Sequence, residues 1–475
     1  MTNEAKRSSF TGKIGFVLAA AGSAVGLGNI WRFPYLAAKY GGGIFLLVYL
    51  VLAVTFGFAL MTAEIAIGRK TGLSAVGAFQ KLSNKFTFVG YLGALVPALI
   101  LPYYSVIGGW VLKYLFAFAT GSAKATADGG AYFSAFIGSD WQAALWFIVF
   151  LGATALIVLF GVEKGIEKVS KVMMPVLVVL ALAVAIYSCT LPGAVEGIKY
   201  YFIPNFNAFS FNTVLAAMGQ LFYSMSLAMG IMITYGSYMK KEVSIESSVT
   251  QIEIFDTGIA FLAGLMVIPA VFSFTGAAPQ SAGPGLMFIS LPQVFTNMGY
   301  VGTVVGAVFF LLVLFAALTS SISLMETVVS IVCDKFKVER KLSCLIVFVV
   351  SVLLGLVSCF GYGMWSDTTV IGMQFLDFFD FLTNSVIMPI IALFTCIVVG
   401  YVIKPKAIED EVEENGAKFK RKALFRVVIK YVAPICIVLI LLSSIVGVYS
   451  EPITNALANV IGHDAAAGIM KYFVV

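Results

Sequence analysis

Long apolar segments, separated by short polar ones, make up most of the chain. A membrane-spanning helix needs about 20 mostly apolar residues. Eleven segments meet this requirement, and they cover residues 13–37, 43–69, 87–118, 142–160, 166–190, 212–238, 247–275, 301–333, 342–361, 371–403 and 425–449. Several exceed the minimum length, which indicates helices that tilt in the bilayer or extend beyond it. The pattern therefore predicts an all-α integral membrane protein with eleven transmembrane helices.

Composition points to the same class of protein. Of the 475 residues, 60% are hydrophobic and 11% are charged, whereas a soluble domain carries about 25% charged residues. The six cysteines form no C-x-x-C pair and the single histidine, His463, lies in the tail. The sequence thus indicates neither a zinc site nor a histidine-based catalytic centre, and we do not expect an enzyme. The first apolar run continues past any small-residue cleavage site, so no cleavable signal peptide is expected.

Basic residues predict the orientation, because lysine and arginine accumulate in cytoplasmic loops. A cytoplasmic N-terminus places 24 of the 30 basic residues on the cytoplasmic side. The other six are Arg32, Lys39, Lys113, Lys124, Lys199 and Lys471. Eleven helices then put the C-terminus outside. We interpret the charged stretch 409–422 as a solvated cytoplasmic loop and the Gly/Pro-rich stretch 276–296 as an ordered outer loop.

Two of the predicted helices contain residues that weaken a helix. Three glycines and an asparagine lie between Gly22 and Asn29, and Arg32 follows in the same segment. The spacing Gly22-x-x-x-Gly26 alone is typical of close helix packing. Clustered glycines destabilise the helix itself, however, and a charge within a membrane segment usually has a function. The segment 212–238 similarly contains Gln220, Ser224, Ser226 and Gly230.

The two weakened helices occupy matching places if the first ten helices form two halves of five. Because five is odd, residues 212–403 would then repeat residues 13–190 with inverted topology, and the helix at 425–449 would be additional. Interrupted helices at matching positions point to the central binding site of a transporter. Their free N–H groups suit a carboxylate and their free carbonyls suit a small cation.

The residues of the first break, Gly22-Ser-Ala-Val-Gly-Leu-Gly-Asn-Ile-Trp-Arg-Phe-Pro34, closely resemble the helix 1 signature of the neurotransmitter:sodium symporters. Further matches follow in order on the predicted helices, at Tyr40–Gly43, Glu64 with Gly68-Arg69, Pro102–Tyr104, Gln220–Tyr238 and Leu318–Ser321. The resemblance implies the LeuT-type inverted-repeat fold, with helices 1 and 6 unwound at mid-membrane. It also implies sodium-coupled import of an amino acid.

The chain resembles the bacterial members of the family in two respects. It has eleven predicted helices, where many members have twelve, and its outer loops are short. We therefore expect the bacterial inner (plasma) membrane as the location. The expected partners are a small amino acid and the lipid bilayer, and no nucleic acid. The functional unit is expected to be a monomer, with a homodimer left open.

The resemblance implies two sodium sites built from oxygen atoms. The first comprises the Ala24 carbonyl, Asn29, Ser224, Asp256 and the substrate carboxylate. The second comprises the carbonyls of Gly22, Val25 and Ala316 and the hydroxyls of Thr319 and Ser320. Without the motif, hydroxyls at 319–321 are equally typical of side chains bonded to their own helix.

The resemblance also implies a substrate site. The carboxylate would meet the N–H groups of Leu27 and Gly28 and the Tyr104 hydroxyl. The ammonium would face Ala24, Tyr223, Ser224 and Ser226. The side chain would be enclosed by Ile100, Tyr223, Met229, Ser320 and Leu324. Taken singly, the apolar members of this set are equally typical of ordinary helix packing.

Two gates follow by the same resemblance. Arg32 and Asp380 would close the outer side, with Asp377 as the rival partner and Tyr104 and Tyr223 as an aromatic lid. The cytoplasmic side would be closed by Arg7 and Asp334, supported by Ser237 and Tyr238. Arg7 is equally explained as one of the basic residues that keep the N-terminus on the cytoplasmic side.

Departures from the family pattern narrow the substrate. Gly26 replaces the aspartate of the monoamine transporters, so the substrate must bring its own carboxylate.

Asp256 replaces a common asparagine, and Ala260 replaces the serine of chloride-dependent members. A fixed carboxylate beside Tyr49, Gln220 and Ser224 would make chloride unnecessary.

Tyr223 and Met229 stand where phenylalanines are common, and methionine adapts to varied shapes. A hydrophobic or aromatic amino acid is therefore expected. Two alternatives are an amino-acid sensor without transport and an ion channel. The channel is disfavoured because the polar residues cluster and do not form a continuous pore.

Overall fold

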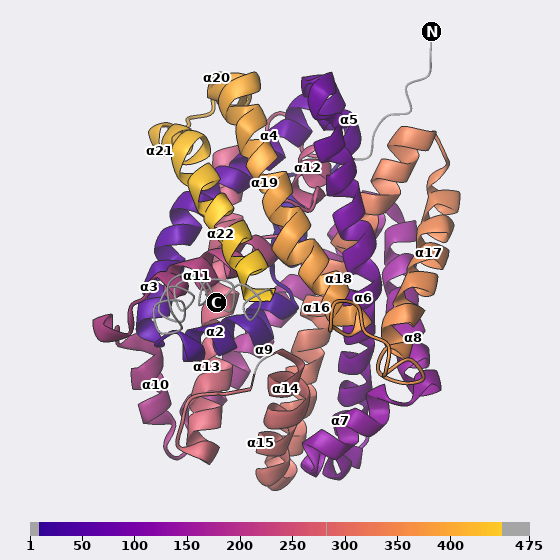
Figure 1. Cartoon of the computed structure of the whole chain (residues 1–475), viewed down its shortest axis with the longest axis vertical. Coiled ribbons are helices and arrows are strands. Elements are labelled where there is room, and N and C mark those ends of the chain that lie inside the picture. The colour runs from indigo at the N-terminus through magenta and orange to yellow at the C-terminus, as the bar shows by residue number, and fades with distance from the viewer. Residues whose placement is uncertain (1–8, 282, 449–475) are drawn as a thin grey trace, which may run out of the picture.

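The structure is a computed structural model that describes residues 9–281 and 283–448. This part of the chain is helical and contains no β-strand (Figure 1). Nine of its helices are long and apolar enough to cross a membrane. They are Gly43–Thr71 (α3, η2 and α4), Asn84–Ala119 (η3 and α6), Asp140–Leu159 (α8), Val162–Cys189 (η5 and α9), Ile245–Thr275 (α13), Gly299–Phe336 (α16), Arg340–Phe360 (α17), Phe375–Val402 (α18, η8, α19 and η9) and Lys422–Ser444 (α21, η11 and most of α22).

The first predicted helix is a bent pair in the structure. The helix α1 (Lys13–Ala24) ends where Val25 adopts an extended conformation, and the chain becomes helical again in η1 (Gly28–Arg32) and α2 (Phe33–Lys39). The two halves are bent by 53° and together could form one more span. Ten of the eleven predicted segments thus correspond to the nine long helices and this pair.

The remaining predicted segment, 212–238, is divided in two. The helix α11 (Phe211–Ser224) begins at a Ser210 cap, and α12 (Ile231–Gly236) begins after Gly230. Between them, Ser226 and Ala228 have positive φ angles of 52° and 58°. Such angles are uncommon outside glycine and concentrate at functional sites. The chain is thus not helical between Ser224 and Ile231, within the segment that the sequence predicts to be weakened.

The outer surface of the bundle carries large apolar side chains. Helices α8, α9 and α17 expose Ile148, Leu156, Val179, Leu345 and Leu353. The bundle interior, by contrast, is closely packed, with α16 against α6 and α13 against α9. An apolar exterior suits lipid, since a monomeric soluble protein rarely exposes large apolar patches.

The two ends of the bundle differ. One end holds α5 (Ala75–Leu82), α12 and α20 (Lys404–Val412), and we call it the inner end (Figure 1). The opposite, outer end holds α7 (Gly129–Ile137), α10 (Ala194–Phe202) and α15 (Leu291–Asn297) (Figure 1). The stretch 276–296, expected to be an ordered loop, contains the short elements α14 (Gly283–Gly285) and η7 (Leu286–Ser290) and most of α15.

The interpretation of residues 409–422 as a solvated loop is wrong. Residues 404–421, which we call the strap, fold back onto the inner end, where Ile408, Glu409 and Val412 are buried. Arg69 of α4 (Phe58–Thr71) pairs with Glu411 at 2.8 Å, and both side chains are at least 95% buried. The buried carboxylates of the strap are tolerated because they are paired, Glu411 with Arg69 and Glu409 with Arg426.

Candidate functional site

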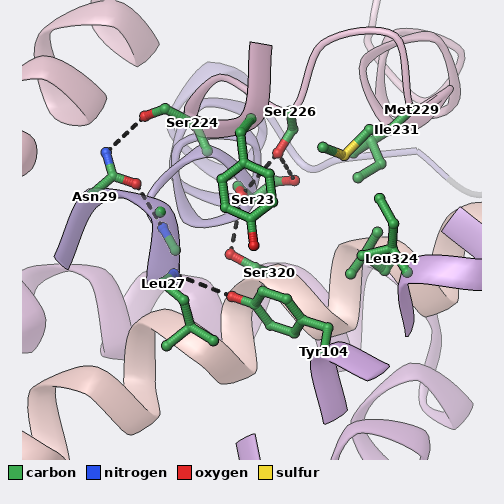
Figure 2. A pocket seen from close by; sticks show the side chains of 15 residues that line it. Ser23, Leu27, Asn29, Tyr104, Ser224, Ser226, Met229, Ile231, Ser320 and Leu324 are labelled. Carbon is green, nitrogen blue, oxygen red and sulfur yellow. Dashed lines mark hydrogen bonds between the residues drawn. The ribbon is translucent and has the colours of Figure 1, made fainter. Parts of the chain in front are cut away.

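A small cavity lies where the two helix breaks face α6 (Thr87–Ala119) and α16 (Figure 2). Its wall contains all eleven residues predicted to bind the substrate. The complete lining is Ser23, Ala24, Gly26, Leu27, Gly28, Asn29, Ile100, Tyr104, Tyr223, Ser224, Ser226, Met229, Ile231, Ser320 and Leu324. The cavity thus brings together Ser23 and Leu324, which are 301 positions apart in the sequence.

The cavity has a polar part and an apolar part (Figure 2). In the polar part, the Leu27 N–H donates to Tyr104 Oη at 3.3 Å, and Ser226 Oγ donates to the Ser23 carbonyl at 3.0 Å. Met229, Ile231 and Leu324 gather on the other side (Figure 2). A molecule with a charged head and an apolar side chain matches this division.

Ser23 and Ile231 line the cavity but are absent from the predicted substrate set. Ser23 donates through Oγ to Ser226 Oγ at 3.1 Å and so ties the two helix breaks together. Its place beside Ala24, within the first break, was the signal that could have identified it. Ile231 begins α12 and follows the predicted Met229 by two positions.

Three of the four protein residues predicted as ligands of the first sodium, Asn29, Ser224 and Asp256, form a buried polar cluster. Asn29 Nδ2 donates to Ser224 Oγ at 2.9 Å and to Asp256 Oδ1 at 2.7 Å, and Ser224 Oγ donates to the same carboxylate oxygen at 2.6 Å. Asn29 Oδ1 accepts the Gly26 N–H at 3.0 Å. The Asp256 carboxylate also accepts the Tyr49 hydroxyl at 3.2 Å. These neutral and anionic oxygen donors suit a hard cation.

The predicted second sodium ligands are also close together. Ser320 Oγ lies 3.4 Å from the Gly22 carbonyl oxygen and 3.3 Å from that of Val25. Thr319 Oγ1 donates to the Ala316 carbonyl at 3.1 Å. Thr319 therefore bonds within its own helix, as the alternative interpretation expected, whereas Ser320 reaches across to the first helix break. The set again consists of oxygen donors alone.

The residues assigned to the outer gate lie around Tyr223. The Arg32 guanidinium is stacked 5.7 Å from the centre of the Tyr223 ring. Asp380 accepts hydrogen bonds from Tyr103 at 3.2 Å and from Asn384 at 2.6 Å. Within the described residues, Arg32 forms no ion pair with Asp380 or Asp377. Arg32 therefore contacts Tyr223, whereas Asp380 is held by hydrogen bonds from Tyr103 and Asn384.

At the inner end, Asp334 accepts the Ser74 N–H at 2.9 Å. Arg7, its predicted partner, lies outside the described residues. Tyr238 donates to Glu326 Oε1 at 2.8 Å, and Arg340 pairs with the same buried carboxylate. Sequence reasoning missed Glu326 and Arg340. The signal was available, because a carboxylate within the predicted span 301–333 is costly in lipid and usually functional.

Comparisons with known proteins cover nearly the whole chain. A family model described as the sodium:neurotransmitter symporter family matches residues 7–126 and 137–468. The uncharacterized sodium-dependent transporter YhdH of Bacillus subtilis (strain 168) is 37% identical over 459 residues, which are 94% of this chain and 100% of that protein. The human sodium- and chloride-dependent GABA transporter 2 is 28% identical over 86% of this chain and 75% of its own length. The crystal structure of MhsT in complex with L-phenylalanine has a TM-score of 0.84 and 38% identity, covering 92% of this chain and 100% of that one.

Proposed function

The chain belongs to the sodium:neurotransmitter symporter family, and on this basis we propose that it imports a zwitterionic, hydrophobic or aromatic amino acid with sodium by alternating access. Family membership makes it a sodium-dependent membrane transporter and not an enzyme. The single observation that carries the proposal is the shared cavity, whose polar part adjoins both oxygen clusters and whose other part is apolar.

In the proposed topology, α11 and α12 form one interrupted span, which brings the number of transmembrane helices to eleven. Residues 13–190 and 212–403 are inverted repeats, and the helix at 425–449 is additional. Both helix breaks then lie at mid-membrane. The inner end faces the cytoplasm of a bacterial cell, with the N-terminus inside and the C-terminus outside, and the monomer is the functional unit.

The substrate orientation follows from the polar and apolar parts of the cavity. The carboxylate is directed to the Leu27 and Gly28 N–H groups and the Tyr104 hydroxyl. The ammonium is directed to the carbonyls around Ala24 and Ser224. Met229, Ile231 and Leu324 enclose the side chain. The MhsT structure, 38% identical, contains L-phenylalanine, which supports a large apolar substrate.

Sodium would be held by the two oxygen clusters, at Asn29, Ser224 and Asp256 and at Thr319 and Ser320. The Asn29 amide must rotate by about half a turn for its oxygen to face the first ion. When bound, each ion adds an inward driving force of about 2.3 kcal/mol per 100 mV of membrane potential. Asn29 and Ser224 of the first cluster line the cavity together with Ala24, so the substrate carboxylate would complete the ligands of the first ion.

We propose that transport does not need chloride. Asp256 places a fixed carboxylate against Tyr49 and Ser224, so the negative charge that accompanies sodium is already part of the protein. Ala260, one turn later on α13, offers no hydroxyl for an anion. The 28% identical human transporter is named as chloride-dependent, and in the present chain the Asp256 carboxylate would take over the role of that anion.

The gates are proposed to alternate. Outer closure would bring Arg32 to Asp380 over the Tyr104 and Tyr223 lid, because Asp380 is already oriented by Tyr103 and Asn384. Inner closure would use Arg7 with Asp334, reinforced by Tyr238 on Glu326. An amino-acid panel competing for sodium-driven uptake of labelled L-phenylalanine tests the substrate class. Competition by leucine, tyrosine or tryptophan supports it, and competition by monoamines alone refutes it.

A further inference from the structure

Arg421, the last residue of the strap, inserts its side chain between two transmembrane helices. Its Nη2 donates to Thr250 Oγ1 at 2.5 Å and to Glu253 Oε2 at 3.1 Å, both on α13 (Ile245–Thr275). Its Nη1 donates to the Val54 carbonyl at 3.4 Å, and its guanidinium carbon lies 3.3 Å from the centre of the Phe58 ring. One side chain therefore contacts both α13 and the helix Gly43–Thr71.

The backbone of the strap fixes the direction of this side chain. The Lys420 N–H donates to Glu246 Oε2 at 2.7 Å, and the Arg421 N–H donates to Glu246 Oε1 at 3.1 Å. Glu246 lies in the first turn of α13. Two hydrogen bonds from consecutive residues to one carboxylate leave the strap little freedom to slide along α13.

The two helices that Arg421 joins are the helices that present Tyr49 and Asp256 to each other. Tyr49 lies about one turn from Val54 on the first helix, and Glu253 lies three residues, or about one turn, before Asp256 on α13. A π turn, η2 (Ala53–Gly57), separates Tyr49 from Phe58, and such turns concentrate at functional sites. Any change in the spacing of the two helices at Arg421 is thus passed to the Tyr49–Asp256 hydrogen bond one turn away.

Glu253 adds an electrostatic reason. Its side chain is 5% exposed, and its Oε1 has no hydrogen-bond partner in the described part of the chain. Arg421 is the ion-pair partner of this buried carboxylate. The pair matters because an uncompensated buried charge is strongly destabilising. Without it, Glu253 would take up a proton or shift toward water, and either change would alter the packing of α13 one turn from Asp256.

We propose that Arg421 is a positioning residue for the cation site at Asp256, acting through the spacing of α13 and the helix Gly43–Thr71. The inference rests on the proposed sodium site. Arg421→Lys tests it, because lysine keeps the charge that Glu253 needs but cannot make the forked contacts or stack on Phe58 in the same way. Arg426→Lys is the matched control, since Arg426 pairs with Glu409 and is half exposed.

The readout is hydrogen–deuterium exchange of the purified, substrate-free protein as sodium chloride replaces choline chloride at constant ionic strength. Peptides from residues 245–260 report on the Asp256 cluster, and peptides from 314–324 report on the Thr319–Ser320 cluster. In Arg421→Lys, the sodium concentration that half-protects 245–260 should rise roughly 3- to 10-fold, within the range seen for indirect coupling. The midpoint for 314–324, and both midpoints in Arg426→Lys, should not change.

Unchanged midpoints in folded Arg421→Lys would overturn the proposal, as would faster exchange that does not depend on sodium. If that variant does not fold, Thr250→Val decides. It removes one contact of Arg421, so a smaller shift at 245–260 supports the proposal and no shift overturns it. An absence of sodium-dependent protection in the wild-type protein would instead refute the proposed sodium site.

Discussion

The Tyr238 hydroxyl donates a 2.8 Å hydrogen bond to Glu326, a carboxylate that is fully buried in α16. Arg340 of α17 (Arg340–Phe360) pairs with the same carboxylate and also donates to the Val158 carbonyl at 2.7 Å. Tyr238 follows the second helix break by eight residues. The network therefore ties the inner part of an interrupted helix to α16 and α8, which do not contain a break.

Tyr238→Phe should loosen this tie and favour states open at the inner end. Removing the hydroxyl leaves a buried carboxylate with one partner fewer. Amino-acid binding at saturating sodium should weaken roughly 3- to 10-fold, as expected when the binding-competent state is less populated. Equilibrium binding of labelled L-phenylalanine measures the change. Tyr401→Phe, whose exposed hydroxyl bonds to the Lys430 carbonyl, is the control, and an equal loss in both variants would refute the gating interpretation.

Tyr104→Phe should weaken binding of the substrate carboxylate. The hydroxyl now accepts the Leu27 N–H and is placed to donate to a carboxylate at the first helix break. A hydrogen bond to a charged group contributes about 1.5–3 kcal/mol, which predicts at least roughly 10-fold weaker binding. Competition binding with a series of amino acids provides the measurement. An unchanged affinity would remove Tyr104 from the carboxylate site.

Gly26→Asp should abolish amino-acid uptake. A Cβ at Gly26 would lie 2.7 Å from Ser320 Oγ and 3.1 Å from Tyr104 Oη, so the new carboxylate would enter the space assigned to that of the substrate. An uncompensated buried charge costs about 3–5 kcal/mol, which predicts a loss of roughly 100-fold or more. Gly26→Ala adds bulk without charge and should retain more uptake. Equal losses in the two variants would contradict the charge argument.

Replacing chloride by gluconate should leave uptake unchanged in the wild-type protein. Asp256 already supplies the negative charge beside Tyr49 and Ser224. In Asp256→Asn this charge is lost, and uptake should fall in both salts because Ala260 offers no hydroxyl to hold a chloride in its place. Initial rates of uptake in matched salts measure both effects. A collapse of wild-type uptake in gluconate would refute chloride independence.

The cavity was predictable because its residues lie in short sequence patterns. The breaks at Gly22–Asn29 and after Ser224 can be predicted from the local sequence, because glycine, asparagine and serine interrupt apolar segments there. The resemblance then places Ile100, Tyr104, Ser320 and Leu324 beside them, and all four line the cavity. Their roles in binding remain predictions, as does the pairing of Arg7, which lies outside the described residues.

The strap was mispredicted because its partners are distant in sequence. Glu411 finds Arg69 and Lys241, at separations of 342 and 170 residues, and Glu253 finds Arg421 at 168. A charged stretch examined by itself is typical of a solvated loop. Only the tertiary arrangement shows that Glu409, Glu411 and Arg421 have oppositely charged partners, and only it shows which residues contact Glu326.

Sodium-driven accumulation in proteoliposomes tests the central claim most directly. An inward sodium gradient should concentrate labelled L-phenylalanine, or a competing apolar amino acid, above its external level, and a sodium ionophore should abolish the gradient of substrate. Counterflow should persist when sodium is equal on both sides. Binding without accumulation or counterflow would identify a sensor, uncoupled current would identify a channel, and either result would contradict sodium-coupled symport.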